Sequence, residues 1–83
     1  MNAPGRFTLY SRHGCHLCEE MQAALALLPA AASHPVEIRD VDADPVTRAR
    51  YGHKIPVLLL DGALVCYGRL DPDEVHKALA PGR

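Results

Sequence analysis

Two cysteines separated by two residues, Cys15 and Cys18, are the side chains of this sequence best suited to chemistry. Thiols at this spacing can close a small disulfide ring, and they can also supply two ligands of a metal site. A β-prone run, Phe7–Ser11, precedes the pair, and a helical pattern follows it. Cys15 is therefore expected at a helix N-terminus, where unpaired backbone N–H groups favour a thiolate. This setting favours thiol–disulfide chemistry.

A metal centre is the main alternative use of this cysteine pair. A closed zinc site takes four ligands. Cys66, His13 and His16 are further possible ligands, but the chain has no second Cys-x-x-Cys pair and no His-x-x-x-His pair. We therefore expect no metal and keep a metal- or iron–sulfur-binding module as the alternative function. A third hypothesis is a binding module in which the dithiol is incidental.

The residues around the dithiol are candidates for tuning its acidity. Lowering a thiol pKa from about 8.5 to about 7 takes roughly 2 kcal/mol of preferential thiolate stabilisation. A helix terminus contributes only about 0.3–1 kcal/mol. The remainder must come from backbone amides, from the S–H group of Cys18, or from the neighbours Arg12, His13 and His16. Arg12 is always charged, whereas His13 either shuttles a proton near neutral pH or is a bystander.

Length, charge and hydropathy exclude several classes of protein. The chain has 83 residues, enough for one domain over residues 1–83 with a small core. Its net charge is −1, and its basic residues are scattered, so we expect no nucleic-acid partner. The longest apolar stretch, residues 23–32, is too short to span a bilayer, and the first residues do not form a signal peptide. We expect a cytoplasmic monomer without a membrane partner.

Three cysteines are too few for a disulfide scaffold. The third, Cys66, lies in an apolar run next to Val65 and Tyr67. Free cysteine often behaves as a small buried hydrophobe, and a regulatory or metal-binding thiol is the alternative.

Local signals place strands and helices around the dithiol. Apolar residues recur at three- and four-residue steps after Cys15, which predicts an amphipathic helix that Pro29 ends. Asp44 and Asp71 are each followed by proline, the pattern of an N-cap before the first helical position. Asp61-Gly62 is typical of a type I′ hairpin. The expected strands cover residues 7–11, 36–41, 55–60 and 63–67, and the expected helices cover 16–28, 45–51 and 72–79.

The resulting element order is β-α-β-α-β-β-α. The first two strands are expected to be parallel, because a helix connects them by a right-handed crossover. The last two strands are expected to form an antiparallel hairpin. The fold class is therefore α/β, with a four-stranded mixed sheet flanked by helices.

This order, with Cys15 and Cys18 after the first strand and Ile55-Pro56 opening the third, resembles the thioredoxin fold and, within it, the glutaredoxin-like family. The resemblance covers about residues 6–80. It implies that Cys15 is the exposed nucleophile and Cys18 the resolving thiol. It also implies a cis peptide bond before Pro56 that presents the backbone of Ile55 to a substrate. The residues alone also allow Pro56 simply to begin a strand.

The resemblance further implies a role for Arg12 in substrate binding, because typical glutaredoxins have Lys or Arg three residues before the first cysteine. Those proteins have Thr-Val-Pro before the third strand and Gly-Gly with an acidic residue after the fourth. This chain has Lys54-Ile55-Pro56 and Gly68-Arg69 at these places. The dithiol itself is intact.

The expected function is that of a small thiol–disulfide oxidoreductase of protein or small-molecule disulfides. It needs no bound cofactor, and glutathione or a disulfide reductase would supply its electrons.

Overall fold

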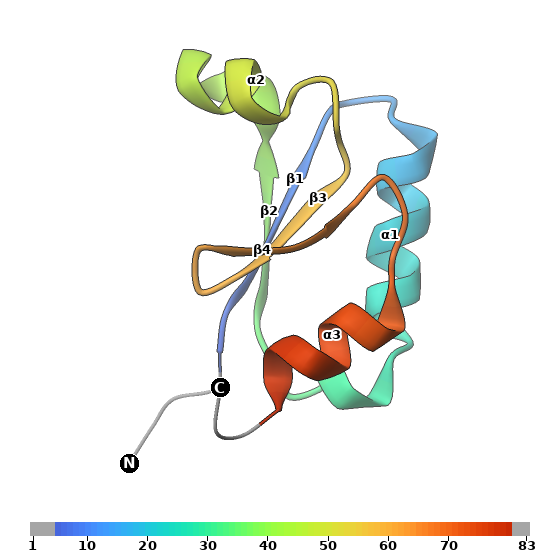
Figure 1. Ribbon diagram of the computed structural model, residues 1–83. Helices are drawn as coiled ribbons and strands as arrows, with labels where there is room; N and C mark the ends of the chain where they lie inside the picture. Colours follow the sequence, from blue (N-terminus) through green and yellow to red (C-terminus); the bar gives the residue numbers. More distant parts are fainter. Residues whose placement is uncertain (1–4, 81–83) are drawn as a thin grey trace.

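A four-stranded mixed sheet in the order β2-β1-β3-β4 forms the centre of the computed structural model, which describes residues 5–80 (Figure 1). β1 pairs with β2 in parallel and with β3 antiparallel, and β3 forms an antiparallel hairpin with β4. The expected α/β fold with a mixed sheet is confirmed. The strands are β1 (Phe7–Ser11), β2 (Val36–Asp40), β3 (Val57–Leu60) and β4 (Ala63–Tyr67).

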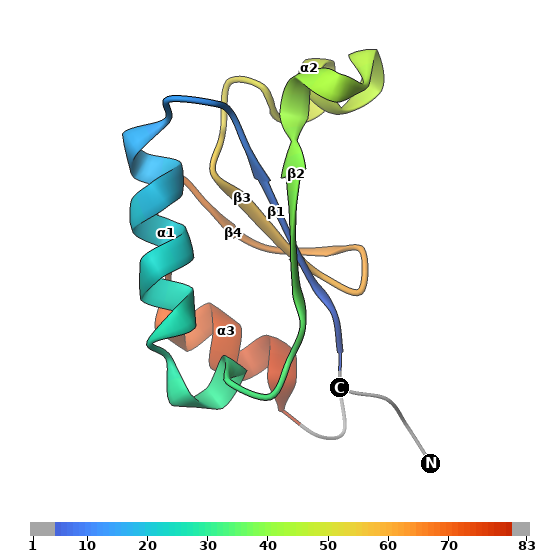
Figure 2. The ribbon, with the colours of Figure 1, turned by 180° about the vertical axis from the view of Figure 1, so that it is seen from behind.

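Three helices and two short 3₁₀ turns connect the strands. They are α1 (His16–Ala26), η1 (Pro29–Ala31), η2 (Val41–Ala43), α2 (Pro45–Tyr51) and α3 (Pro72–Leu79). α1 and α3 lie on one side of the sheet. α2 lies at the end of the sheet that is farthest from α3 (Figures 1 and 2). Asp44 and Asp71 cap α2 and α3 as expected, because their carboxylates accept backbone N–H bonds from the first turn.

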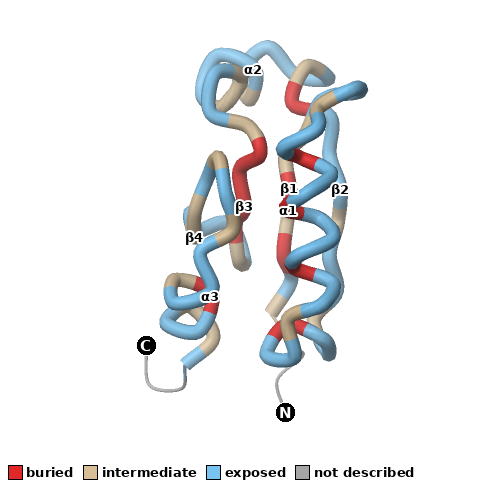
Figure 3. Tube along the Cα trace, turned by 90° about the vertical axis from the view of Figure 1, so that its right-hand side faces the viewer, coloured by how far each residue is buried: buried red, intermediate tan, exposed pale blue. Residues whose placement is uncertain are grey.

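The core lies between the sheet and the two helices α1 and α3 (Figure 3). Strand alternation points Phe7 and Leu9 of β1 toward these helices, and both side chains are fully buried. Tyr10 points to the opposite face, where its ring stacks on Tyr51 of α2 at 5.2 Å. The core cluster comprises Phe7, Leu9, Met21, Leu25, Ala31, Leu58 and Val75.

Three element boundaries differ from the expected ones. α1 ends at Ala26 instead of residue 28, because Pro29 restricts Leu28, whose backbone is extended. β2 ends one residue early, because the Asp40 carboxylate accepts a bond from the Asp42 N–H and starts a turn. β3 begins at Val57 instead of residue 55, since Pro56 cannot donate to the sheet.

The hairpin between β3 and β4 combines an expected and an unexpected feature. Asp61 and Gly62 both have positive φ, at 50° and 86°, as the type I′ signal predicts. The pairing then shifts register between Leu58 and Leu59, which inserts Val65 as a bulge in β4. Val65 and Cys66 consequently both pack against the core. Among residues 5–80, none of the helices has the length and apolar character needed to cross a membrane.

Candidate functional site

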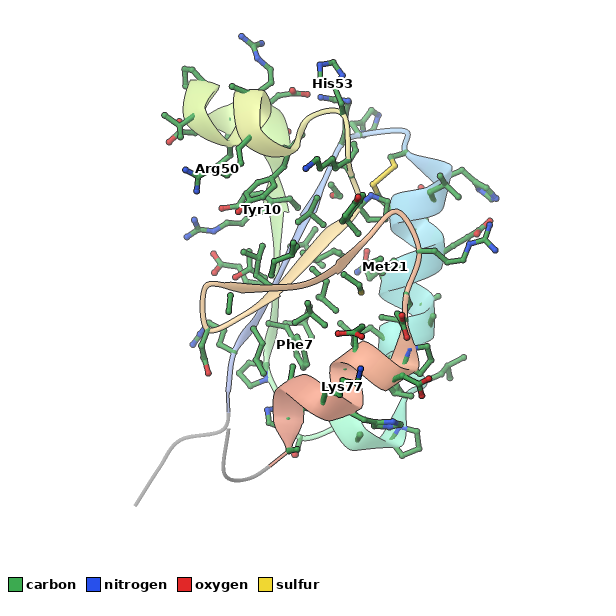
Figure 4. The ribbon with its side chains drawn as sticks, in the orientation of Figure 1. Phe7, Tyr10, Met21, Arg50, His53 and Lys77 are labelled. Carbon is green, nitrogen blue, oxygen red and sulfur yellow. A yellow bond between two sulfur atoms is a disulfide. The ribbon has the colours of Figure 1, made fainter. Side chains whose placement is uncertain are left out.

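Cys15 and Cys18 form a disulfide at the N-terminus of α1 (Figure 4). A turn closed by the bond from the Cys15 N–H to the Arg12 carbonyl leads from β1 into the helix, and Gly14 takes the left-handed backbone of this turn, with φ at 77°. Cys15 is the N-cap residue, and its sulfur accepts the N–H of Cys18 at 3.2 Å. The disulfide thus sits against the positive end of an 11-residue helix.

The two cysteines differ in accessibility. Cys15 is half-buried, whereas Cys18 lies one turn further into α1 with only 3% of its surface exposed. An incoming molecule therefore reaches Cys15 first. Cys18 is held against the core side of the helix, beside the same sulfur.

The loop before β3 lies beside the loop that carries Cys15, because the Arg12 guanidinium reaches the Gly52 carbonyl at 3.4 Å (Figure 1). The peptide bond between Ile55 and Pro56 is cis, so this prediction is confirmed. Pro56 is buried, and its carbonyl accepts the Gly68 N–H at 2.7 Å. This bond ties the loop before β3 to the loop after β4.

Arg12 makes the shortest side-chain contact near the dithiol. Its guanidinium donates two bonds to the Asp42 carboxylate, at 2.6 and 2.8 Å, and a longer one to the Gly52 carbonyl. The paired guanidinium lowers the pKa of Asp42 below its usual range. Arg12 thereby ties the loop after β1 to η2 and to the end of α2. Its role in substrate binding stays a prediction.

Asp42 is the residue that sequence reasoning missed. It lies 30 positions from Arg12, and no local pattern connects the two. The positive charge of Arg48 makes a smaller contribution to the lowered pKa of Asp42.

The two histidines near the dithiol have different surroundings. His16 lies within 2.7 Å of the Glu20 carboxylate, one turn along α1 on the exposed side of the helix. His13 is exposed in the loop before Cys15. Their part in tuning the dithiol stays a prediction. Among the residues that the structure describes, no group of three or more His, Cys, Asp and Glu side chains is placed to hold a metal ion.

Cys66 is a free thiol, half-buried in β4 and packed against the core. Burial is the main cause that raises the pKa of Cys66, so less of it is thiolate at neutral pH. In the reduced protein, we expect iodoacetamide at pH 8 to label Cys66 more slowly than Cys15. Peptide mass spectrometry over a time course measures both rates. Labelling of Cys66 ahead of Cys15 would contradict this assignment. The control is the urea-unfolded protein, in which the two cysteines should be labelled at equal rates.

The mixed sheet, the Cys-x-x-Cys disulfide at the start of α1 and the cis-proline loop are together typical of a thioredoxin-fold protein, and this chain has that fold. Residues 6–80 match the family described as Glutaredoxin-like domain (DUF836), and the chain belongs to this family.

Relatives and solved structures agree with this family. An uncharacterized protein of Mycobacterium tuberculosis is 31% identical over 77 residues, which cover 87% of this chain and 79% of that protein. The solution structure of protein Ne2328 from Nitrosomonas europaea superposes with a TM-score of 0.84 at 30% identity, over 96% of both chains. A crystal structure from X. campestris has a TM-score of 0.70 at 30% identity, over 90% of this chain and 99% of that one.

Proposed function

We propose that this protein is a small thiol–disulfide oxidoreductase that uses Cys15 as its nucleophile and Cys18 as its resolving thiol. The observation that carries the proposal is the N-cap position of Cys15, whose sulfur accepts a backbone N–H while Cys18 lies buried beside it. An N–H donor and a helix N-terminus both favour a thiolate at that sulfur. The glutaredoxin-like family of the chain fits such a redox role, and so does the disulfide between Cys15 and Cys18.

The proposed reaction is an exchange in two steps. The Cys15 thiolate attacks one sulfur of the substrate disulfide, forms a mixed disulfide and expels the other substrate sulfur as a thiolate. Cys18 then loses its proton and attacks the Cys15 sulfur, which closes the Cys15–Cys18 disulfide and releases the second substrate thiolate. Two electrons pass from the protein to the substrate. An external thiol or dithiol must then reduce the protein again.

The loop before β3 suits the binding of a polypeptide substrate. An extended chain can pair with exposed backbone as an added strand. In the proposal, the backbone of Ile55 next to Pro56 provides this contact, and the substrate disulfide reaches Cys15. Glutathione or a flavoprotein disulfide reductase are the proposed electron donors, and no bound organic cofactor takes part. Such a reductant suits the cytoplasm, where thiols are kept reduced.

A single-turnover experiment tests the proposal without a physiological reductant. The protein is reduced, freed of reductant and mixed with an excess of a disulfide-containing peptide. We expect one peptide disulfide to be reduced per chain, and the protein to lose two hydrogens as Cys15 and Cys18 reoxidise. Mass spectrometry counts both products. A Cys66→Ser variant is the control and should give the same stoichiometry. If the folded protein reduced the peptide no faster than an unfolded control, the proposed function would be ruled out.

A further inference from the structure

Three loops surround the dithiol, and their charge is unbalanced. The loops cover residues 12–15, 52–56 and 68–71; the first two lie at the end of the molecule where α1 begins, and the third runs from β4 along α1 to α3 (Figure 1). They carry one carboxylate, Asp71, which is engaged in capping α3. The whole chain has nine basic and ten acidic residues, so this excess of positive charge is local. Counted in the same way, the basic residues of the loops are Arg12, Lys54 and Arg69, and the loops also hold His13 and His53.

Not all cations at this end are available to a ligand. Arg12 is paired with Asp42. Within residues 5–80, neither Lys54, Arg69 nor Arg48 forms an ion pair. We call Arg48, His53, Lys54 and Arg69 the basic rim.

Contacts hold part of the basic rim in place. The Lys54 ammonium lies 5.4 Å from the centre of the Tyr67 ring, a cation–π contact that keeps its charge at the surface. Tyr67 is itself 53% exposed. The bond between Gly68 and Pro56 holds the two loops together. Lys54 is therefore positioned by a partner that leaves its charge uncompensated.

Two cavities are lined both by the other rim residues and by residues close in sequence to Cys15. One, of about 440 Å³, is lined by Arg48 and His53 together with Arg12, which precedes Cys15. The other, of about 290 Å³, is lined by Arg69 together with Leu17, which follows Cys15. Glu20 also lines the second cavity, where His16 pairs with it. Figure 4 shows His53 and the disulfide at the same end of the molecule.

We propose that the preferred substrate is a disulfide in an acidic polypeptide segment, whose carboxylates on both sides of the disulfide contact the basic rim. This inference rests on the proposed function and names its substrate class. An extended segment that pairs with the backbone of Ile55 would carry its flanking residues over the two cavities. Two rim residues, Lys54 and Arg69, stand where this chain departs from typical glutaredoxins.

The expected preference follows from the strength of exposed ion pairs. Each exposed pair changes an equilibrium by a factor of about 1.5 to 5, and charge steering also raises the rate of encounter at low salt. Several pairs together predict that an acidic peptide reacts about tenfold faster than a neutral one. At 1 M salt the Debye length is about 3 Å, so most of this advantage should disappear.

The experiment compares three peptides of equal length that each contain one internal disulfide. Their flanking residues are aspartate, serine or lysine. The second-order rate of reaction with the reduced protein is measured at low and high salt, and glutathione disulfide is measured alongside. The aspartate peptide should react fastest and the lysine peptide slowest, and the order should collapse at high salt.

A matched pair of double variants separates the rim from the total charge. Lys54→Gln with Arg69→Gln removes two charges from the rim, and the aspartate peptide should lose about five- to tenfold in rate. Arg6→Gln with Lys77→Gln removes two charges elsewhere, and Figure 4 shows Lys77 at the opposite end of the molecule from the disulfide. This control should keep the wild-type preference. The ratio of the aspartate-peptide rate to the serine-peptide rate should fall in the Lys54→Gln and Arg69→Gln protein and stay at the wild-type value in the control.

Each other outcome overturns a distinct statement. Equal rates for the three peptides at low salt, or equal losses in the two double variants, overturn the acidic-segment proposal and leave the oxidoreductase intact. If glutathione disulfide instead reacts faster than the aspartate peptide and depends equally on Lys54 and Arg69, the preferred substrate is a small anionic disulfide and not a polypeptide. Failure of every disulfide to react removes the proposed function itself.

Discussion

Replacing Cys15 with serine is expected to lower the single-turnover rate of disulfide reduction by more than about 10³-fold, to the uncatalysed level. A serine hydroxyl is not ionised at neutral pH and does not attack a disulfide. Serine is a good N-cap residue, so the variant keeps the cap of α1. The loss should therefore appear in the chemistry and not in the fold, which a thermal melt of the reduced proteins checks. Retention of the wild-type rate by Cys15→Ser would falsify the assignment of the nucleophile.

The companion variant Cys18→Ser separates the two roles. Cys15 can still attack, but no thiol remains beside it to release the substrate. The variant should accumulate a mixed disulfide, seen as a mass increase of one substrate per chain that dithiothreitol removes. Cys66→Ser is the control and should release its substrate normally. A mixed disulfide on Cys18 in the Cys15→Ser variant would reverse the assignment.

Local sequence signals were sufficient where a few neighbouring residues decide the structure. Asp44 and Asp71, each followed by proline, start α2 and α3 at the expected residues. Asp61 and Gly62 take the positive φ values that a two-residue hairpin requires. The parallel pairing of β1 with β2 and the antiparallel pairing of β3 with β4 follow from these elements, because a short hairpin must be antiparallel and a helical crossover favours a parallel pair.

Other features depend on residues far apart in the sequence and could not be predicted in this way. The bulge at Val65 results from how β4 fits against β3 and the core. The pair of Arg12 with Asp42 forms only when the loop after β1 meets η2. Sequence reasoning therefore identified Arg12 as a cation beside the dithiol but not the carboxylate that neutralises it.

This difference changes how charge near the dithiol is interpreted. With Arg12 paired, the cations near the dithiol that form no ion pair within residues 5–80 are Lys54, Arg48 and Arg69, which come from other elements than Cys15. The sequence places them at scattered positions, and only the fold brings them to one end of the molecule. A charge effect on substrate choice is therefore a property of the tertiary structure.

The second large effect concerns stability, because α1 carries the dithiol and also fills the core. Leu25 is 2% exposed in α1, and Leu27, two residues later, is 83% exposed. Leu25→Ala removes buried methyl groups and leaves a cavity in the core between α1 and the sheet, so it should lower the free energy of unfolding by about 2–5 kcal/mol. A domain of this size has roughly 4–12 kcal/mol in total, so the loss is a large fraction of it.

Leu27→Ala is the matched control, since it makes the same chemical change on the surface and should stay within about 0.5 kcal/mol of wild type. Urea unfolding of the reduced proteins measures both values, and an unchanged slope with a lower midpoint identifies a loss of stability. Leu25 lies at the far end of α1 from Cys15, so the folded fraction of Leu25→Ala should reduce disulfides at the wild-type rate. Equal stability of the two variants would mean that the inner face of α1 does not anchor the helix. A slower reaction in folded Leu25→Ala would instead show that packing along α1 sets the position of the Cys15 sulfur.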